Sequence, residues 1–417
     1  MRKGFLIIIA MGVCALLQVT VTAQSFSSLP NANSETASNA VTAASSVARP
    51  FAVTDLRARL DQARELLKSQ SNLAGGSTVA LAVFDRQTSQ LDVIRMAKDS
   101  FLTKGLTLSI ISQTGRALNV TIVRANGVNT AVRITDAANG SELTPLTVAF
   151  PIVKGGSLTE VAYYSSAHPA VVTNDVAGAG ETYISTMLDN AAHELEAKGI
   201  HVSSDIVDIA EHLCVVEHTD HRRFMTEDHT ALLPEIVSLY ALNRGNTFRY
   251  SVSTAGAGGM IQMIPRTYDA IRQQHASVPL KADFVEGMRD HANALQAMLL
   301  YMNDTWTNLA ESSEVQDALR NGVATKPELL AAGYNSNPGR LPTYLKNGGT
   351  NWRTLIPAET QMYLAIYSEV DRNISFPQHG DGVKVATAND PNLALPARAP
   401  RMGLFMTWMN SLFARVL

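Results

Sequence analysis

Cysteine is nearly absent from this sequence of 417 residues, which contains only Cys14 and Cys214. Cys14 lies in an N-terminal apolar run that we expect to be removed, so Cys214 is left without a partner for an intrachain disulfide. This excludes a scaffold held together by disulfides. We expect Cys214 to be a free, buried thiol in an ordinary hydrophobic core.

The chain also lacks an excess of charge of either sign, with a formal net charge of −3 and 46% hydrophobic residues. Proteins that bind nucleic acid or anionic lipid through a general electrostatic field need a larger excess of one sign. We therefore expect no nucleic-acid partner. Internal repeats, heptad runs and glycine-rich phosphate loops are also missing, so any recognition must depend on a local site.

The most apolar run of the sequence, Phe5–Val19, is too short for a comfortable membrane span. Arg2 and Lys3 precede it and small residues ending in Ala23 follow it, a pattern typical of a secretory signal peptide. We predict a signal peptide over residues 1–23 and export to the periplasm or cell envelope. An uncleaved membrane anchor is the alternative.

Composition divides the rest of the chain into four segments. Residues 24–54 are rich in Ser, Asn, Ala and Thr and predict a disordered tether, because they offer little apolar surface to bury. Residues 55–170 and 171–372 predict two domains, and residues 373–417 a tail. The apolar end of the tail, Met402–Leu417, favours docking onto the protein over membrane contact, which stays open.

The segment 55–170 begins with a predicted helix, Asp55–Lys68, and continues with short runs rich in Val, Ile and Thr. These runs predict strands at Thr78–Phe84, Leu106–Ser112, Leu118–Arg124 and Ala131–Thr135. Asn126-Gly127, Asn139-Gly140 and Gly155-Gly156 can supply the positive φ angles of tight turns. The fold class we predict is α+β, with a small antiparallel β domain followed by a mainly α domain.

Long helical periodicities fill the segment 171–372. The clearest predicts one helix over Phe284–Leu309, with an apolar stripe that we interpret as core and not as a ligand groove. The stripe consists of Val285, Met288, Ala292, Leu295, Leu299, Met302, Trp306 and Leu309.

A shorter predicted helix, Asp205–Glu217, carries an apolar arc that consists of Ile206, Ile209, Ala210, Leu213 and Val216. At about 100° per residue, Glu217 falls inside the arc and Glu211 points away from it. Burial raises the pKa of a carboxyl group toward the range of a general acid. The alternative is that Glu217 lies beyond the last helical turn and faces solvent or pairs with Arg222 or Arg223.

A small-residue turn, Ser253–Pro265, resembles the signature of the soluble lytic transglycosylases, which are relatives of goose-type lysozyme. Matching positions are Ser253, Gly256, Ala257, Gly259, Gln262 and Pro265, while Ile261 replaces a methionine. Two further elements follow in the family's order. Gly333–Gly339 resembles the family's second element, an Ala-Tyr-Asn-Ala-Gly-Pro-Gly run. Ile356–Leu364 resembles its third element, a Leu-Pro-x-Glu-Thr-x-x-Tyr-Val segment. The resemblance covers about residues 200–370.

This resemblance implies a lysozyme-like fold for residues 171–372 and peptidoglycan glycan strands as the partner. It implies cleavage of the β-1,4 bond between N-acetylmuramic acid and N-acetylglucosamine, with a 1,6-anhydro product. Glu217 would be the single acid and base, assisted by the substrate's acetamido group, without metal or other cofactor. Substrate-binding positions implied in the same way are Ser253, Gly256, Ala257, Gln262, Tyr334 and Asn335. Loop capping and helix packing are their local alternatives.

The sequence departs from the family pattern around the expected acid. His218 follows Glu217 where the family usually has serine, and the gap to Ser253 is longer than in the family. The additional residues include an apolar stretch, Leu232–Leu242, that predicts an extra helix. Glu235 within it is therefore the rival catalytic residue.

Two other functions stay open. A lysozyme-like fold can bind glycan without cutting it, and the β domain would then dock a protein partner of the envelope. A metal-dependent hydrolase would use the histidines, Cys214 and acids near residues 212–229, although their spacing matches no zinc-binding helix. This cluster consists of His212, Cys214, Glu217, His218, Asp220, His221 and His229.

Overall fold

The computed structural model describes residues 53–69, 76–377 and 379, which all belong to one compact unit. The predicted signal peptide, nearly all of the tether and most of the tail, with its apolar end, lie outside the described residues. None of the helices in this described part is both long and apolar enough to span a membrane.

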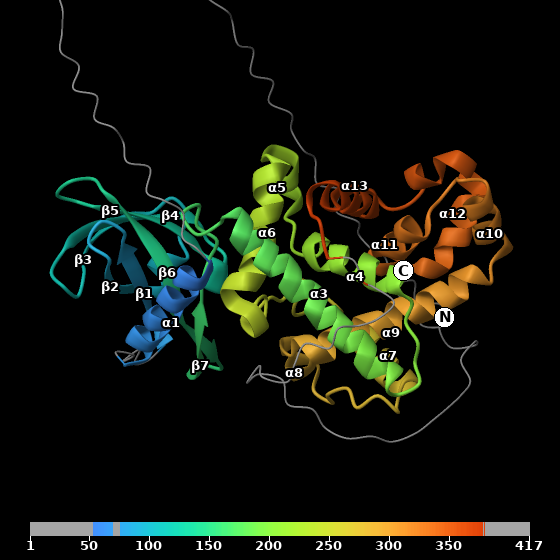
Figure 1. Ribbon diagram of the computed structural model, residues 1–417, viewed down its shortest axis with the longest axis horizontal. Coiled ribbons are helices and arrows are strands. Elements are labelled where there is room, and N and C mark those ends of the chain that lie inside the picture. Colours follow the sequence, from blue (N-terminus) through green and yellow to red (C-terminus); the bar gives the residue numbers. More distant parts are fainter. Residues whose placement is uncertain (1–52, 70–75, 378, 380–417) are drawn as a thin grey trace, which may run out of the picture. The chain divides into compact units, whose positions relative to one another are not determined.

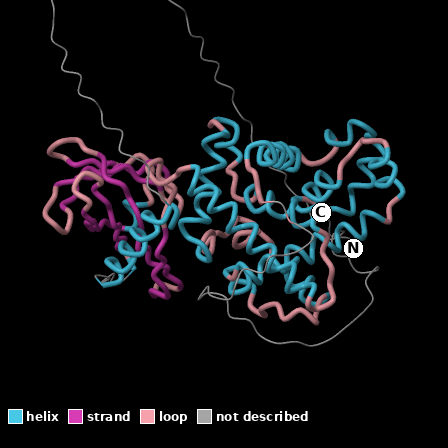
Figure 2. The backbone as a smooth tube through the Cα atoms, in the orientation of Figure 1, coloured by secondary structure: helices cyan, strands magenta, loops and turns pink. Residues whose placement is uncertain are grey.

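The predicted α+β class is confirmed: an antiparallel sheet is followed by a mainly helical part (Figures 1 and 2). The strands are β1 Thr78–Asp85, β2 Gln90–Ala97, β3 Thr107–Ile111, β4 Ala117–Arg124, β5 Ala131–Asp136, β6 Glu142–Lys154 and β7 Ser157–Tyr164. Their order is β2-β1-β6-β5-β4-β3, and β7 pairs with β6. The four predicted strands are confirmed as β1, β3, β4 and β5, whereas β2, β6 and β7 were not predicted.

Two of the three predicted turns have the expected form. Gly140 adopts a φ of 73° between β5 and β6, and Gly155 and Gly156 adopt 56° and 79° between β6 and β7. At Asn126-Gly127 the predicted positive φ is present, 52° at Gly127, but the tight hairpin form is wrong, because a short 3-10 helix, η2 (Gly127–Asn129), joins β4 to β5. Thr130 closes this longer connection by donating its hydroxyl to the Gly127 carbonyl at 2.8 Å.

The sheet buries both of its faces at β1, which is apolar from Val79 to Phe84 and buried at every position after its first residue. Val79, Leu81 and Val83 belong to one apolar cluster, and the alternate residues Ala80, Ala82 and Phe84 belong to another. The predicted helix near the start is confirmed as α1 (Val53–Ser69), which packs against the second of these faces. The helix-spaced residues that make this contact are Leu56, Leu60, Ala63 and Leu67.

Residues 174–373 form the helical part around one large apolar core. Its α-helices are α3 Asn174–Glu196, α4 Ser204–Val216, α5 His221–Thr226, α6 His229–Asn243, α7 Pro265–Gln274, α8 Phe284–Arg289, α9 His291–Ala310, α10 Ser313–Arg320, α11 Lys326–Asn335, α12 Leu341–Gly348 and α13 Ala358–Asn373. The extra helix predicted around Glu235 is confirmed as α6.

The prediction of a single helix over residues 284–309 is wrong at one residue. Asp290 has extended backbone, φ −101° and ψ 109°, which ends α8 and begins α9. Its carboxylate accepts hydrogen bonds from the N–H groups of Ala292 and Asn293, so it acts as an N-cap in the middle of the predicted helix. Most of the predicted stripe lies in the core, but Val285 is 43% exposed.

Helix α6 links the sheet to the helical core. Leu232, Leu233 and Ile236 belong to the core of the helices, whereas Leu239 and Leu242 belong to the clusters of the sheet. At the end of α6, the Asn243 side chain accepts a hydrogen bond from Ser165 N (2.7 Å) and donates one to Ser165 O (2.8 Å). The two regions predicted as separate domains therefore share buried contacts.

Glycine permits the close packing of α6 on α3. A Cβ atom at Gly180 would lie 2.1 Å from the Val237 carbonyl oxygen, so no side chain fits between the two backbones.

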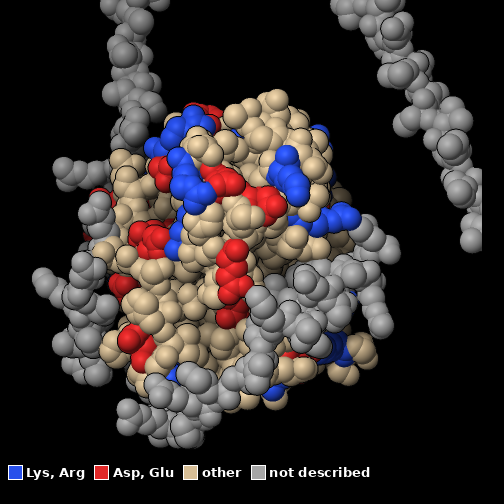
Figure 3. Space-filling model, turned by 90° about the vertical axis from the view of Figure 1, so that its right-hand side faces the viewer, with Lys and Arg blue, Asp and Glu red and all other residues tan. Residues whose placement is uncertain are grey.

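On the face that Figure 3 shows, acidic and basic side chains lie close to one another among a larger number of uncharged residues, in keeping with the small net charge.

Candidate active site

A cleft of about 460 Å³ opens at the C-terminal end of α4. Residues from the three sequence elements that carry the family resemblance line this cleft, together with the end of α4. Five of the six predicted substrate-binding residues are among them, and so is Glu217; they are Ser253, Ala257, Gln262, Tyr334 and Asn335. The fold thus brings together segments that are more than a hundred residues apart in the sequence.

Glu217 is the C-cap residue of α4 and retains helical backbone, with a φ of −60°. The predicted apolar arc of this helix is buried at all five positions, which places Glu217 at the edge of the core. The glutamate is half-buried, with its carboxyl group facing the cleft. Tyr363 on α13 donates its hydroxyl to Oε1 of Glu217 at 2.7 Å.

Burial raises the pKa of Glu217 to about 8, because the carboxylate loses solvation in this position. The hydrogen bond from Tyr363 opposes the shift, and the charge of Glu359 at the cleft adds to it. The alternative prediction, in which Glu217 pairs with Arg222 or Arg223, is not what the structure shows. Arg223 pairs with Glu227 and Glu235, and Arg222 is exposed. Its surroundings therefore favour the neutral form of the Glu217 carboxyl group near neutral pH.

The turn that begins at Ser253 depends on left-handed backbone at Gly256 (φ 79°), Gly259 (69°) and Gln262 (45°). A Cβ atom at Gly259 would lie 2.2 Å from the Met288 carbonyl oxygen, so glycine allows the turn to lie directly on α8. Gln262 stabilises the same turn by donating its Nε2 to the Gly259 carbonyl at 2.7 Å.

Ser253 and Gly256 have structural roles in this turn. Ser253 Oγ accepts a hydrogen bond from Ala257 N at 3.0 Å, while the residue remains exposed at the cleft. Gly256 is the one predicted substrate-binding residue that does not line the cleft. Its N–H donates to the Ser253 carbonyl at 3.0 Å, so it shapes the wall of the cleft and does not form part of its surface.

Tyr334 and Asn335 end helix α11 and hold neighbouring segments. Tyr334 donates its hydroxyl to the Ile261 carbonyl at 2.8 Å, which ties α11 to the glycine-rich turn. Asn335 Oδ1 accepts a hydrogen bond from Thr360 at 2.8 Å, which ties α11 to α13. These bonds leave the Nδ2 group of Asn335 as a hydrogen-bond donor at the cleft.

Among the cleft residues that sequence reasoning missed are Glu359 and Tyr363, the two that affect the pKa of Glu217. Both lie in the third resembling element, four residues apart on α13, so they share one helix face. Burial keeps the pKa of Tyr363 well above its usual value, so its hydroxyl remains a donor. The spacing could have predicted a shared face, but only the fold shows that this face meets Glu217.

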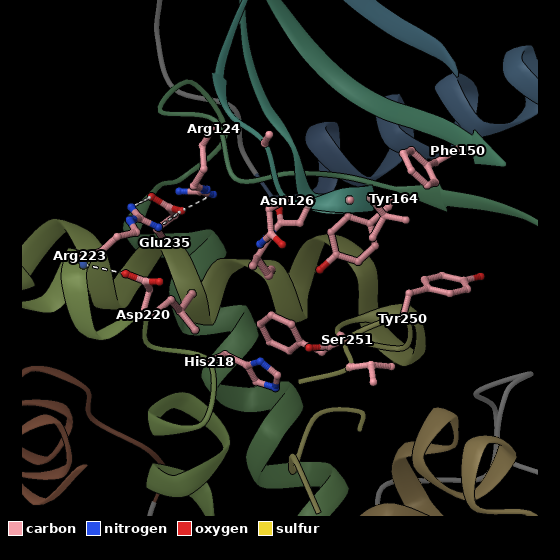
Figure 4. A pocket seen from close by; sticks show the side chains of 18 of the residues that line it. Arg124, Asn126, Phe150, Tyr164, His218, Asp220, Arg223, Glu235, Tyr250 and Ser251 are labelled. Carbon is pink, nitrogen blue, oxygen red and sulfur yellow. Dashed lines mark hydrogen bonds and ion pairs between the residues drawn. The ribbon is translucent and has the colours of Figure 1, made fainter. Parts of the chain in front are cut away.

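Glu235 lines a different cavity, of about 550 Å³, between the sheet and the helices (Figure 4). Arg223 contacts its two oxygens at 2.9 and 2.7 Å, and Arg124 from β4 contacts Oε1 at 3.0 Å. Tyr164 and Tyr250 line the same cavity away from this ion-pair network. Glu235, the rival residue in the sequence, is thus a paired carboxylate outside the cleft of Glu217.

His218, which stands in place of the family's serine, faces this second cavity. Its ring stacks on Phe248 with centroids 3.4 Å apart, and its Nε2 donates to the Met260 carbonyl at 3.0 Å. Burial lowers the pKa of His218 to about 3, so the ring is neutral. Packed on Phe248, it forms part of the wall of this cavity.

The histidine and cysteine cluster near residues 212–229 does not converge on one point. His212 contacts Asp371 at 3.4 Å, whereas His229 stacks on Phe224 and bonds its carbonyl at 2.7 Å. His221 lines the Glu217 cleft, and Cys214 is a buried free thiol, as predicted. These residues do not form a common metal site in the structure.

Glu211, which is predicted to point away from the apolar arc of α4, is nevertheless buried. Glu211 is only 1% exposed and accepts a hydrogen bond from Ser185 on α3. His379, which follows α13, lies 2.9 Å from its Oε1 atom. Distant segments of the chain cover this side of α4, which the helical spacing of a single segment cannot reveal.

Comparison with protein-family models, curated proteins and solved structures finds no match for this chain.

Proposed function

We propose that this protein is a lytic transglycosylase that cleaves peptidoglycan glycan strands in the cell envelope. The observation that carries the proposal is the position of the Glu217 carboxyl group, at the edge of the apolar core and bonded by Tyr363, in a cleft lined by all three resembling sequence elements. A general acid must hold its proton at working pH, and burial gives Glu217 this property.

The first step would transfer the Glu217 proton to the glycosidic oxygen as the bond to C1 of N-acetylmuramic acid breaks. The sugar's own acetamido oxygen would stabilise the positive charge that develops at C1, which removes the need for a carboxylate nucleophile. Tyr363 would stabilise the new carboxylate of Glu217, because its hydroxyl already donates to Oε1 at 2.7 Å.

The second step would return the proton to Glu217. The carboxylate would accept it from the sugar's 6-hydroxyl group while the 6-oxygen bonds to C1, giving the 1,6-anhydro ring without water. The glycine-rich turn allows the substrate to approach the protein backbone closely, and Asn335 Nδ2 offers a donor at the cleft. Ser253 and Gln262 would contact the sugar from the opposite wall.

The test is incubation of the purified protein with peptidoglycan sacculi, followed by mass spectrometry of the released fragments. We expect 1,6-anhydro-muropeptides from the wild type and from Glu235→Gln, and none from Glu217→Gln. Reducing ends would instead indicate hydrolysis by a lysozyme. Sacculus binding without any release would indicate a glycan-binding protein, and release that a chelator abolishes would indicate a metal-dependent hydrolase.

A further inference from the structure

A buried group of ionisable side chains lies at a distance from the cleft, where the chain after α13 crosses α3 and α4. It consists of Asp189 from α3, Asp208 and Glu211 from α4, and His379. The side chains of His379 and Glu211 are 7% and 2% exposed, whereas Asp208 is half exposed.

The two ring nitrogens of His379 have different surroundings. Nδ1 lies 2.6 Å from Asp189 Oδ1, and a carboxylate at this position holds a proton on Nδ1. Nε2 is directed at the other two acids, 2.9 Å from Glu211 Oε1 and 3.6 Å from Asp208 Oδ1. The buried Nε2 is at ion-pair distance from Glu211, but it is not aligned for a hydrogen bond with either acid.

The charges of this group are not balanced by the usual cations. Among the described residues, no lysine or arginine forms an ion pair with Asp189, Asp208 or Glu211. Even with a protonated imidazole, these three carboxylates leave an excess of negative charge, which is costly at the buried Glu211, although Asp189 and Asp208 are partly exposed. A divalent cation would supply the missing positive charge.

We propose that Asp208, Glu211 and His379 bind a zinc ion. One oxygen or nitrogen atom from each of the three residues lies within 4.8 Å of the others. Ligands at about 2.0–2.1 Å from a tetrahedral zinc ion are separated by about 3.3 Å, close to the separations of Nε2 from the two acids. The fourth position would hold water.

The donor set favours zinc over calcium or magnesium. Calcium and magnesium prefer oxygen ligands alone, whereas zinc accepts imidazole nitrogen together with carboxylate oxygen. Asp189 would be a positioning residue, because it orients the His379 ring through Nδ1 in the manner of the carboxylates that support metal-bound histidines. Ser185 would orient Glu211 in the same way through its hydrogen bond.

A zinc ion here would join two parts of the chain that are distant in sequence. It would tie the segment after α13 to α4, and α4 ends at Glu217 while α13 carries Tyr363. The site would therefore stabilise the arrangement of the two helices that meet at the cleft. The proposal does not depend on glycan cleavage, because the ion would be structural.

Isothermal titration calorimetry of tag-free full chain with zinc chloride, after treatment with a chelator, tests this site. We expect one zinc ion per chain and a rise of the melting temperature that saturates with zinc. Magnesium and calcium at the same concentration should have no such effect. Absence of stoichiometric zinc binding would overturn the proposal and leave the group as an ion-pair network with a protonated histidine.

Variants localise the binding. His379→Ala should abolish stoichiometric zinc binding, and Asp189→Asn, which keeps all three ligands, should weaken it by about 10-fold to 100-fold. His201→Ala is the matched control, since His201 is an exposed histidine that also contacts a glutamate, Glu196, at 2.9 Å. Asp208→Asn replaces a half-exposed ligand and is compatible with folding. Wild-type affinity in both His379→Ala and Asp208→Asn would place the zinc elsewhere and refute the site.

Discussion

Two glutamates near the two cavities of this protein have opposite surroundings. Glu217 lies at the edge of the apolar core with a tyrosine as its hydrogen-bond partner, and burial raises its pKa to about 8. Glu235 instead contacts two guanidinium groups, from Arg124 and Arg223. The two carboxyl groups thus differ in their partners, a tyrosine hydroxyl in one case and two arginines in the other, and this difference underlies the proposal that Glu217 is the general acid.

The strongest test of this comparison is the activity of two matched variants on sacculi. Glu217→Gln removes the transferable proton and keeps the shape, so we expect release of anhydro-muropeptides to fall by about 10²-fold to 10⁴-fold. Glu235→Gln should retain activity within a few-fold of wild type. The rates are measured by chromatography of the soluble products. The reverse pattern would transfer the catalytic role to Glu235.

A second prediction concerns the stability of Glu217→Gln as a function of pH. A folded-state pKa of about 8, above the ordinary value of 4.5, means that the unfolded chain loses a proton that the folded protein retains. The wild type should therefore lose stability as pH rises from about 4.5 to 8, whereas glutamine avoids this loss. We expect the variant to be more stable than wild type by about 1–2 kcal/mol near pH 8, after allowance for partial solvation.

Thermal unfolding of both proteins across this pH range measures the effect. The advantage of the variant should disappear below the unfolded-state pKa, where the wild-type carboxyl group is protonated in both states. Identical pH dependence of wild type and variant would mean that Glu217 is solvated and ionised in the folded protein.

A third prediction sharpens the role of Tyr363. Tyr363→Phe removes the hydrogen bond that stabilises the carboxylate of Glu217, so the pKa of Glu217 should rise further and turnover should fall by about 10-fold. The pH–activity profile on sacculi should shift to higher pH on its alkaline side. Tyr301→Phe is the control, because Tyr301 lines the same cleft but donates to the Gly333 carbonyl. An equal loss in both variants would indicate a general packing effect.

The smallest effect that we expect is the change in stability caused by Glu235→Gln. Glu235→Gln leaves Arg124 and Arg223 without their shared anion, and these groups are about a quarter or less exposed. We expect a loss of about 1 kcal/mol, since partial solvation reduces the value of an ion pair. Urea denaturation measures it. Glu227→Gln, which removes a more exposed partner of Arg223, should cost less, and a larger cost there would contradict this ranking.

The sequence was informative where one segment carried the whole signal. The apolar arc of α4 predicted the buried side on which Glu217 lies, and Ser253, Gln262 and Asn335 matched positions that the fold brings to one cleft. The α+β class followed from the change from strand-like to helical periodicity. These features depend on local spacing, which a single sequence contains.

Features that depend on distant contacts were missed or wrong. Glu211 is buried because His379, far along the chain, covers that side of α4. Strands β2, β6 and β7 show less regular patterns, and their pairing with β1 and with one another defines them. Asp290 interrupts a continuous apolar stripe because its side chain caps α9, a local competition that the hydrophobic pattern does not reveal.

The position of α6 has a consequence for how the protein unfolds. Its leucines enter the cores of both the sheet and the helices, and its backbone touches α3 at Gly180 with no room for a side chain. Local opening of the sheet would expose Leu239 and Leu242, which weakens the same helix that supports the other core. The two regions should therefore lose hydrogen-exchange protection together, and amides of β1 and α9 should report one cooperative unfolding event.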